Sequence, residues 1–156
     1  MPWQRRLQPF IRPLYQLHSR LTRSTTLGVR GLVFNAAGDV LLVEHTYTPG
    51  WYLPGGGVER GETVEQALVR ELAEEAGVRA LSRPKLLSVH SNNRVFRGDH
   101  VVVLQVDEWE PCEATAHYEI RAVGWFTPGE LPANTTPSTR RRVAELLQGL
   151  APTPHW

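Results

Sequence analysis

Three glutamates near the middle of the chain are the residues whose types and spacing best suit chemistry. Glu71 and Glu75 lie four residues apart, and Glu74 lies three residues after Glu71. On a helix these carboxylates share one face, and each like-charge pair at such spacing costs a surface helix roughly 0.2 to 0.5 kcal/mol. A positive partner is therefore expected nearby, and the adjacent Arg70 neutralises only part of the charge.

Clustered carboxylates without histidine or cysteine suit Mg²⁺, with Mn²⁺ as a substitute. These ions combine a few carboxylates with waters and phosphate oxygens to complete six-fold coordination. An acidic cluster on a helix is more often a solvated face than a metal site, so the glutamates alone are weak grounds for a function. The preceding run Pro54-Gly55-Gly56-Gly57 adds to them, because glycines let a backbone approach a ligand closely.

A helix over residues 63–76 must carry the glutamates. Thr63 followed by Gln66 predicts an N-terminal capping box, and Gly77 predicts the end of the helix. At about 100° per residue, the carboxylates fall beside the apolar stripe of this helix and should line a cleft. The stripe consists of Val64, Leu68 and Leu72.

The rest of the chain alternates between strand-like and helical segments. Residues 28–34 and 40–45 are β-rich runs around a turn-forming sequence, which predicts a hairpin. The other predicted elements are strands at 51–53, 86–90, 101–106 and 123–126, and helices at about 13–21 and 138–150. This order predicts an α/β (α+β) fold, with a mixed β-sheet covered by helices on its faces.

The spacing around the glutamates is that of a known motif. Gly56 is followed after five residues by Glu62, and after seven more by Arg70-Glu71-Leu72; one residue later come Glu74-Glu75, and after one more Gly77-Val78. All nine positions match the Nudix box, so the chain resembles the Nudix hydrolase family. The resemblance is carried by residues 56–78 and more loosely by the element order from residue 28 to residue 150.

The resemblance implies an α/β/α sandwich around a mixed sheet and a role for each residue of the box. Glu71, Glu74 and Glu75 would bind Mg²⁺ together with the carbonyl of Gly56. Two further residues of the box, Arg70 and Glu62, would surround these ligands. Arg70 would orient a glutamate, with a plain surface pair to Glu74 as the alternative. Glu62 would support the metal site from its edge or bind a metal through water; alternatively it would only favour the helix dipole. Leu72 and Val78 would belong to the core and Gly77 to a turn.

Nudix enzymes hydrolyse a nucleoside diphosphate linked to another moiety, an acid anhydride of phosphorus. The resemblance thus implies a pyrophosphohydrolase in which water attacks phosphorus and a carboxylate accepts the proton. That carboxylate corresponds either to Glu71 or to a glutamate of a later loop, for which Glu119 is the candidate. The alternative is a non-catalytic Nudix-like module that binds a nucleotide as a sensor, although every carboxylate of the box is present.

Substrate choice is less visible in the sequence. The marks of the ADP-ribose, dinucleoside polyphosphate, coenzyme A and NADH subclasses are missing, which leaves nucleotides and nucleotide sugars open. Arg94 and Arg97 would grip phosphate, and Trp51 or Tyr52 would stack on a base. For each of these residues, loop solvation or core packing is the more common role.

Composition narrows the class and the partners. The 156 residues carry 17 basic and 16 acidic side chains, so no overall field favours nucleic acid or a membrane surface. We expect a small-molecule partner, and a cytoplasmic location because Cys112 is the only cysteine. We expect a helical extension at 1–26, which would cover the core or form a homodimer contact, the Nudix hydrolase domain at 27–150, and a loose tail at 151–156.

Overall fold

The computed structural model describes residues 25–156, so the helix expected at 13–21 and the role of its segment in a homodimer lie outside the described residues. The strands are β1 (Thr26–Val33), β2 (Val40–His45), β3 (Trp51–Tyr52), β4 (Val78–Ala80), β5 (Lys85–Ser91), β6 (Asp99–Val106), β7 (Trp109–Pro111) and β8 (Ile120–Phe126). The helices are α2 (Val64–Ala76), the short 3₁₀ helix η1 (Pro128–Glu130) and α3 (Pro137–Gln148).

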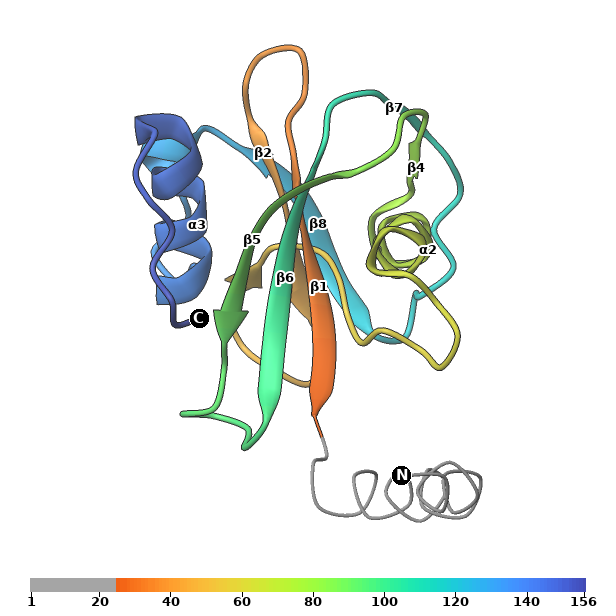
Figure 1. Cartoon of the computed structure of the whole chain (residues 1–156). Helices are drawn as coiled ribbons and strands as arrows, with labels where there is room; N and C mark the ends of the chain where they lie inside the picture. The colour runs from red at the N-terminus through yellow and green to blue at the C-terminus, as the bar shows by residue number, and fades with distance from the viewer. Residues whose placement is uncertain (1–24) are drawn as a thin grey trace, which may run out of the picture.

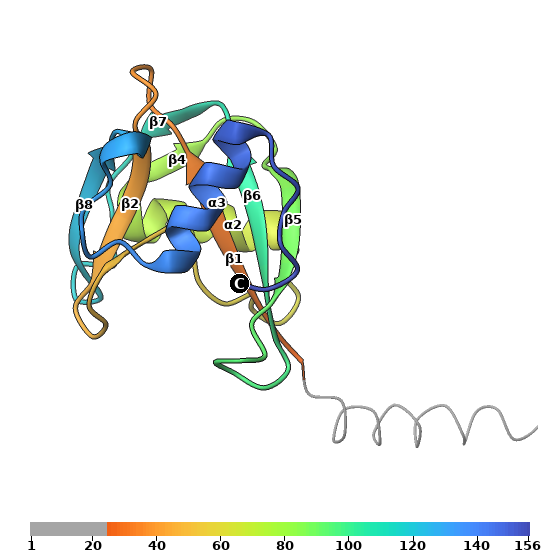
Figure 2. The same cartoon turned by 90° about the vertical axis from the view of Figure 1, so that its left-hand side faces the viewer.

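Strands lie between two helices, as expected for an α/β/α sandwich. Helices α2 and α3 flank the strands on opposite sides, and a view turned by 90° shows α3 in front of the strands with α2 behind them (Figures 1 and 2). One three-stranded sheet has the order β1-β6-β5, a second has the order β3-β2-β8, and β4 and β7 form a two-stranded sheet. Strands β1 and β6 are parallel whereas β5 and β6 are antiparallel, so the predicted mixed pairing is confirmed.

Two hydrophobic clusters explain why the central strands are apolar on both faces. Neighbouring residues of one strand point to different clusters, since side chains alternate between the two faces of a sheet. The cluster beneath α2 contains Leu41, Leu68, Leu72 and Leu104, and the cluster beneath α3 contains Leu42, Leu53, Val103 and Val143. Each strand therefore needs a helix on both sides, and burying both faces fixes the sandwich.

The hairpin predicted between residues 28–34 and 40–45 is wrong. The two runs form β1 and β2, but β1 pairs with β6 and β2 pairs with β3 and β8; Phe34 and Val40 form one isolated bridge at the turn. The other edge of β1 is occupied by the glycine loop instead. Backbone hydrogen bonds run from Val29 N–H to the Gly56 carbonyl and from Gly31 N–H to the Pro54 carbonyl, both at 2.8 Å.

Strands β4 and β7 were missed in the sequence because each has three residues. They pair with each other, and β4 begins directly after α2. Val78 is therefore buried as expected, but it lies in a strand. No helix within residues 25–156 is long and apolar enough to cross a membrane.

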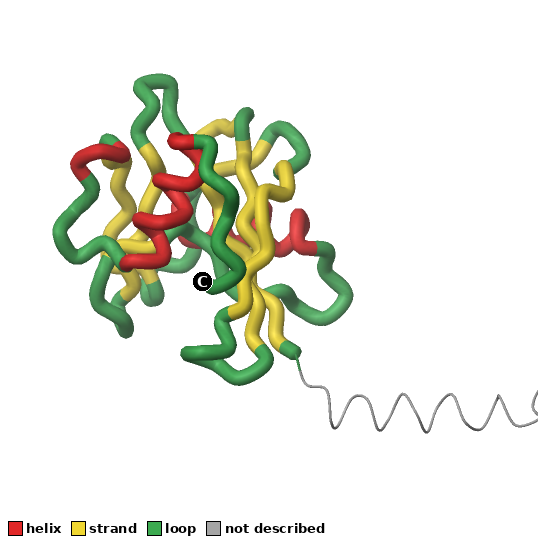
Figure 3. Tube along the Cα trace, turned by 60° about the vertical axis from the view of Figure 1, so that its left-hand side comes forward, coloured by secondary structure: helices red, strands yellow, loops and turns green. Residues whose placement is uncertain are grey.

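The segment 151–156, expected to be loose, is bonded to the end of β5. Ser91 N–H donates to the Pro154 carbonyl at 2.9 Å, and Trp156 N–H donates to the Ser91 carbonyl at 3.0 Å. Figure 3 shows this segment returning from α3 alongside the strands. The segment contains two prolines, Pro152 and Pro154, but strand-like bonding to β5 holds it in place.

Candidate active site

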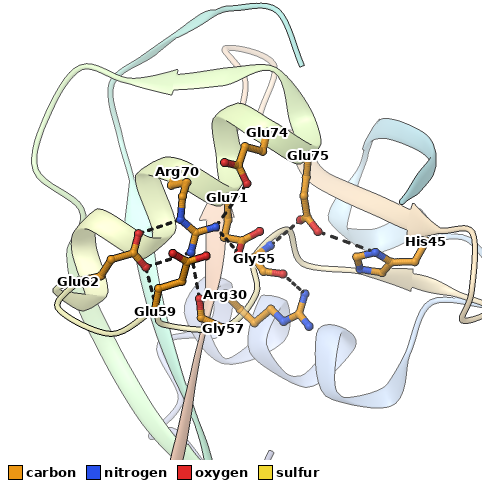
Figure 4. Close-up of polar contacts among 10 residues, drawn as sticks. All are labelled: Arg30, His45, Gly55, Gly57, Glu59, Glu62, Arg70, Glu71, Glu74 and Glu75. Atoms are coloured by element: carbon orange, nitrogen blue, oxygen red, sulfur yellow. Dashed lines mark hydrogen bonds and ion pairs between the residues drawn. The ribbon is translucent and has the colours of Figure 1, made fainter. Parts of the chain in front are cut away.

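Helix α2 holds the three glutamates in the predicted frame. The Thr63 hydroxyl accepts from Gln66 N–H, the Gln66 side chain accepts from Thr63 N–H, and the helix ends at Gly77 with φ of 62°. The capping box and the stop are thus confirmed. Leu68 and Leu72 are fully buried, which fixes the rotation of the helix and turns the carboxylates of Glu71 and Glu75 toward the glycine loop (Figure 4).

The glycine loop lies against these carboxylates because it is bonded to β1. Gly55 adopts φ of 140°, and a Cβ atom there would meet the Val29 carbonyl oxygen at 2.1 Å. A Cβ atom on Gly56 would meet Glu71 Oε1 at 2.5 Å. Glycine at both positions therefore allows the backbone to pass between β1 and the carboxylate of Glu71.

Replacing Gly55 by alanine is expected to lower the free energy of unfolding by several kcal/mol, whereas Gly57→Ala serves as its matched control. Alanine at 55 combines an unfavourable φ with a collision against backbone that cannot rotate away. A Cβ atom on Gly57 meets nothing within 4 Å, so its effect should stay below about 1 kcal/mol. Urea denaturation followed by circular dichroism measures both, and equal effects would contradict this account.

Arg70 connects the loop to the acidic face of the helix. Its guanidinium donates to Glu62 at 2.8 and 3.0 Å, to Glu71 Oε1 at 2.8 Å and to the Gly57 carbonyl at 3.1 Å, while Glu74 is 3.4 Å away. The alternative of a plain surface pair with Glu74 thus describes only the longest of these bonds. The bonds from Arg70 lower the pKa of Glu62 to about 2, so Glu62 is a permanent anion that anchors Arg70.

Glu75 is the most buried carboxylate of the helix, with 6% of its surface exposed. Its Oε2 atom accepts a hydrogen bond from Gly55 N–H at 2.9 Å. Burial raises its pKa to about 7, since the charged form loses hydration, and burial also raises the pKa of Glu71. The site therefore contains two carboxylates whose charge is not fully compensated by the protein.

Arg30, His45 and Tyr47 complete the surroundings of Glu75 and were missed in the sequence. Arg30, from β1, donates to the carbonyls of Leu53 at 3.0 Å and Gly55 at 2.8 Å. His45 Nδ1 lies 3.8 Å from Glu75 Oε1, and burial followed by the charge of Arg30 lowers the pKa of His45. The available signal was Arg30 itself, a charged residue inside an otherwise apolar strand.

Glu119 reaches the edge of this site through the loop that follows β7. The N–H groups of Thr115 and Ala116 donate to the Glu74 carbonyl at 3.0 and 2.9 Å, and Thr46 N–H donates to the Glu119 carbonyl at 2.8 Å. Glu119 is exposed, and its negative charge contributes to the raised pKa of Glu75. The loop thus brings a fourth carboxylate near the helix.

A cavity of about 490 Å³ adjoins the glycine loop. Of Arg94, Arg97 and Trp51, which were expected to bind substrate, only Arg97 lines it. Arg97 lines this cavity with Arg30, Gly56 and Gly57, whereas Arg94 is exposed and is not among the lining residues. Trp51 packs edge-on against Phe126, with ring centroids 4.7 Å apart, in the cluster beneath α3. Trp51 is therefore partly buried against the core beneath α3 and is not among the residues that line this cavity.

The donor atoms fit a hard divalent cation, although they need to converge further. Within residues 25–156 no three His, Cys, Asp or Glu side chains are gathered as a metal cluster, since Glu74 turns to Arg70 and Glu75 to Gly55. All the available donors are carboxylate or carbonyl oxygens, which Mg²⁺ prefers. The loop backbone meets Glu71 so closely that only glycine fits, and burial, which raises the pKa of Glu71 and Glu75, makes their charged forms costly unless a cation lies beside them.

Comparison with known proteins finds one family. The model of the NUDIX domain matches residues 24–147. A "Putative 8-oxo-dGTP diphosphatase" of Bacillus subtilis (strain 168) is 30% identical over 124 residues, covering 80% of this chain and 81% of the relative. A "MutT-like protein" of Streptomyces ambofaciens is 31% identical over 127 residues, covering 81% and 80%. The crystal structure of a MutT NUDIX hydrolase from Burkholderia pseudomallei superposes with a TM-score of 0.68 at 27% identity, covering 79% of this chain and 98% of that one.

Proposed function

This chain belongs to the Nudix family of hydrolases, and from that premise we propose that it is a magnesium-dependent pyrophosphohydrolase of a nucleoside diphosphate derivative. The observation that carries the proposal is the pair of buried or half-buried carboxylates, Glu71 and Glu75, packed against the glycine-loop backbone. Gly56, against which Glu71 packs, also lines a cavity that is large enough for a small molecule. The name of the Bacillus subtilis relative makes nucleoside triphosphates the first substrates to test.

Each residue of the site has a proposed part in the reaction. Glu71, Glu74 and Glu75, with the Gly56 carbonyl, would hold the cation. When bound, the cation would neutralise phosphate oxygens and lower the pKa of the attacking water. Arg70 restrains Glu71 and is itself fixed by Glu62, so it keeps one carboxylate oriented while the others adjust. Either Glu71 or Glu119 accepts the proton from the water.

Arg30 has the position of a phosphate-binding group. It lines the cavity beside Gly56 and Gly57, and its guanidinium is held by two loop carbonyls. A positive charge fixed in this way attracts phosphate oxygens without a large entropic cost. Cys112, the only cysteine, needs no oxidising compartment, and we propose a cytoplasmic location on this ground.

The proposal predicts turnover that requires both magnesium and the glutamates. Purified protein is incubated with nucleoside triphosphates, nucleotide sugars, ADP-ribose and dinucleoside polyphosphates, first with Mg²⁺ and then with chelator. We expect Glu74→Gln to lower turnover about a hundredfold. Glu65→Gln is the matched control, because Glu65 lies on the same helix but bonds to Arg83 at 2.8 Å, and it should retain activity within about twofold.

Two results would contradict the proposal. Equal losses of turnover in Glu74→Gln and Glu65→Gln would show that the cluster of Glu71, Glu74 and Glu75 has no specific role in the reaction. Tight binding of a nucleotide without turnover of any compound would instead support a non-catalytic nucleotide sensor, in which the same carboxylates only bind.

A further inference from the structure

The segment 151–156 lies outside the residues that match the family, which end at residue 147. It is nevertheless built into the molecule through β5, since Ser91 exchanges backbone hydrogen bonds with Pro154 and Trp156. An isolated bridge also joins Ser91 and His155. These bonds fix where the side chain of Trp156 lies.

A buried polar network under α3 holds the other end of the segment. Arg142 is 2% exposed and donates to Glu145 at 2.9 Å and to the Thr153 hydroxyl at 2.7 Å. Glu145 also accepts from Thr153 N–H at 3.0 Å, and the Thr153 carbonyl lies 2.6 Å from His90 Nδ1. Buried charged groups of this kind persist only when they are bonded, so the network favours one path for the segment.

This path brings Trp156 to the cavity beside the glycine loop. The indole of Trp156 packs against the His90 ring, with the two ring centroids 5.8 Å apart. The guanidinium carbon of Arg142 lies 5.7 Å from the centroid of the indole. It also lines the cavity that contains Gly56, Gly57 and Arg30. Trp156, whose ring is backed by His90 and Arg142, therefore lines the same space as the proposed phosphate-binding groups.

Phe96 adds a second aromatic ring to the cavity wall. It lies in the loop between β5 and β6 and is 65% exposed, so its ring is accessible to a ligand in the cavity. Polar atoms are also present, since the amide of Asn92, which bonds to Asp99 at 2.7 Å, lines the cavity with both aromatic rings. Aromatic rings with a few polar groups next to phosphate-binding backbone suit a planar heterocycle linked to phosphate.

We propose that Trp156 and Phe96 form a base-binding subsite, and that the segment 151–156 thereby determines which nucleoside derivatives the cavity accepts. The inference rests on the proposed function for the orientation of the ligand, with its phosphates toward Arg30 and the glycine loop. Stacking of a base on an aromatic side chain changes affinity by about tenfold to a hundredfold.

The test compares two ligands that share ribose and phosphate and differ by the base. Guanosine monophosphate and ribose 5-phosphate contain no anhydride, so binding to the full chain is measured by calorimetry without turnover. We expect Trp156→Ala to raise the Kd of guanosine monophosphate about tenfold or more, and Trp156→Phe to restore it to within about threefold. The Kd of ribose 5-phosphate should stay within about twofold in both variants.

Further variants separate stacking from a general effect on folding. Phe96→Ala removes an exposed side chain, so it should weaken guanosine monophosphate binding without changing the melting temperature. Leu147→Ala, at an exposed apolar residue of α3 outside this cavity, is the matched control and should change neither. Equal weakening of both ligands in Trp156→Ala and Phe96→Ala, or no effect on guanosine monophosphate, would overturn the inference.

The outcomes also distinguish this inference from the proposed function. If guanosine monophosphate binding depends on Trp156 but no anhydride is hydrolysed, the subsite stands and the pyrophosphohydrolase proposal fails. If anhydrides are hydrolysed and wild-type protein binds guanosine monophosphate no more tightly than ribose 5-phosphate, the subsite is wrong and the hydrolase proposal stands.

Discussion

Glu71→Gln is expected to lower kcat about a thousandfold while the protein remains folded. The Glu71 side chain is 14% exposed, accepts from Arg70 at 2.8 Å and lies directly against Gly56. Glutamine keeps the shape but removes the charge, so the site loses a proposed metal donor and a candidate base in one change. Loss of several kcal/mol of transition-state stabilisation corresponds to about two to three orders of magnitude in rate.

Stability should respond much less than rate to this substitution. Burial raises the pKa of Glu71, so its charged form already lowers the stability of the folded state. Arg70 also keeps its two bonds to Glu62 in the variant. Steady-state kinetics over a range of Mg²⁺ concentrations measures the effect, with Glu65→Gln as control and the melting temperature as a check on folding. A kcat within tenfold of wild type at saturating Mg²⁺ would show that Glu71 neither binds the cation nor accepts the proton.

The site helix could be predicted from the sequence because its signals are local. A capping box at Thr63, a glycine stop at Gly77 and an apolar stripe all act within a few residues. The same signals fix which face of the helix is buried, so the shared face of the three glutamates followed directly. The structure confirms the capping box and the stop.

The surroundings of the helix depend on contacts between distant residues, which spacing does not reveal. A turn at residues 35–39 connects β1 and β2, but the edge of β1 that a hairpin would use is hydrogen-bonded to the glycine loop. Arg30 reaches the site only through that pairing. Trp51 points to α3 because a two-residue strand has one side chain on each face, and its sequence does not say which.

The segment 151–156 shows a similar limit. A loose tail was expected there, whereas its docking depends on Arg142 and His90, which belong to α3 and β5. Arg142 and His90 hold the segment only after folding has brought α3 and β5 next to it. Elements whose stability comes from such tertiary bonds leave no local pattern in the sequence.

Glu75→Gln is expected to stabilise the metal-free protein at pH 8 while greatly reducing its activity. The pKa of Glu75 is raised from 4.5 to about 7 in the folded state. The unfolded chain therefore loses its proton at lower pH than the folded protein, and stability falls as pH rises between these two values. Above pH 7 the folded wild type carries a buried charge that costs on the order of 3 kcal/mol, which the neutral amide avoids.

The surroundings of Glu75 can accommodate the amide. The Gly55 N–H still finds a side-chain oxygen, and His45 Nδ1, which is buried without a hydrogen-bond partner within residues 25–156, lies 3.8 Å from the present Oε1. An amide N–H is a suitable donor to a neutral imidazole nitrogen. The substitution therefore leaves no new buried group unpaired, and the expected stabilisation is not offset by a lost hydrogen bond.

The measurement is urea denaturation in chelator at pH 5 and pH 8, with activity assayed in Mg²⁺. The variant should exceed wild type in free energy of unfolding at pH 8, approach it at pH 5, and lose at least about a hundredfold in kcat. Glu65→Gln is the control, because the bond from Arg83 lowers the pKa of Glu65, so its removal cannot produce a gain that grows with pH. The same difference at both pH values would show that Glu75 is not a buried charge. Full activity in the variant would show that its charge has no part in binding the cation, and only the combination of a more stable and less active protein agrees with a carboxylate kept for function at a cost in stability.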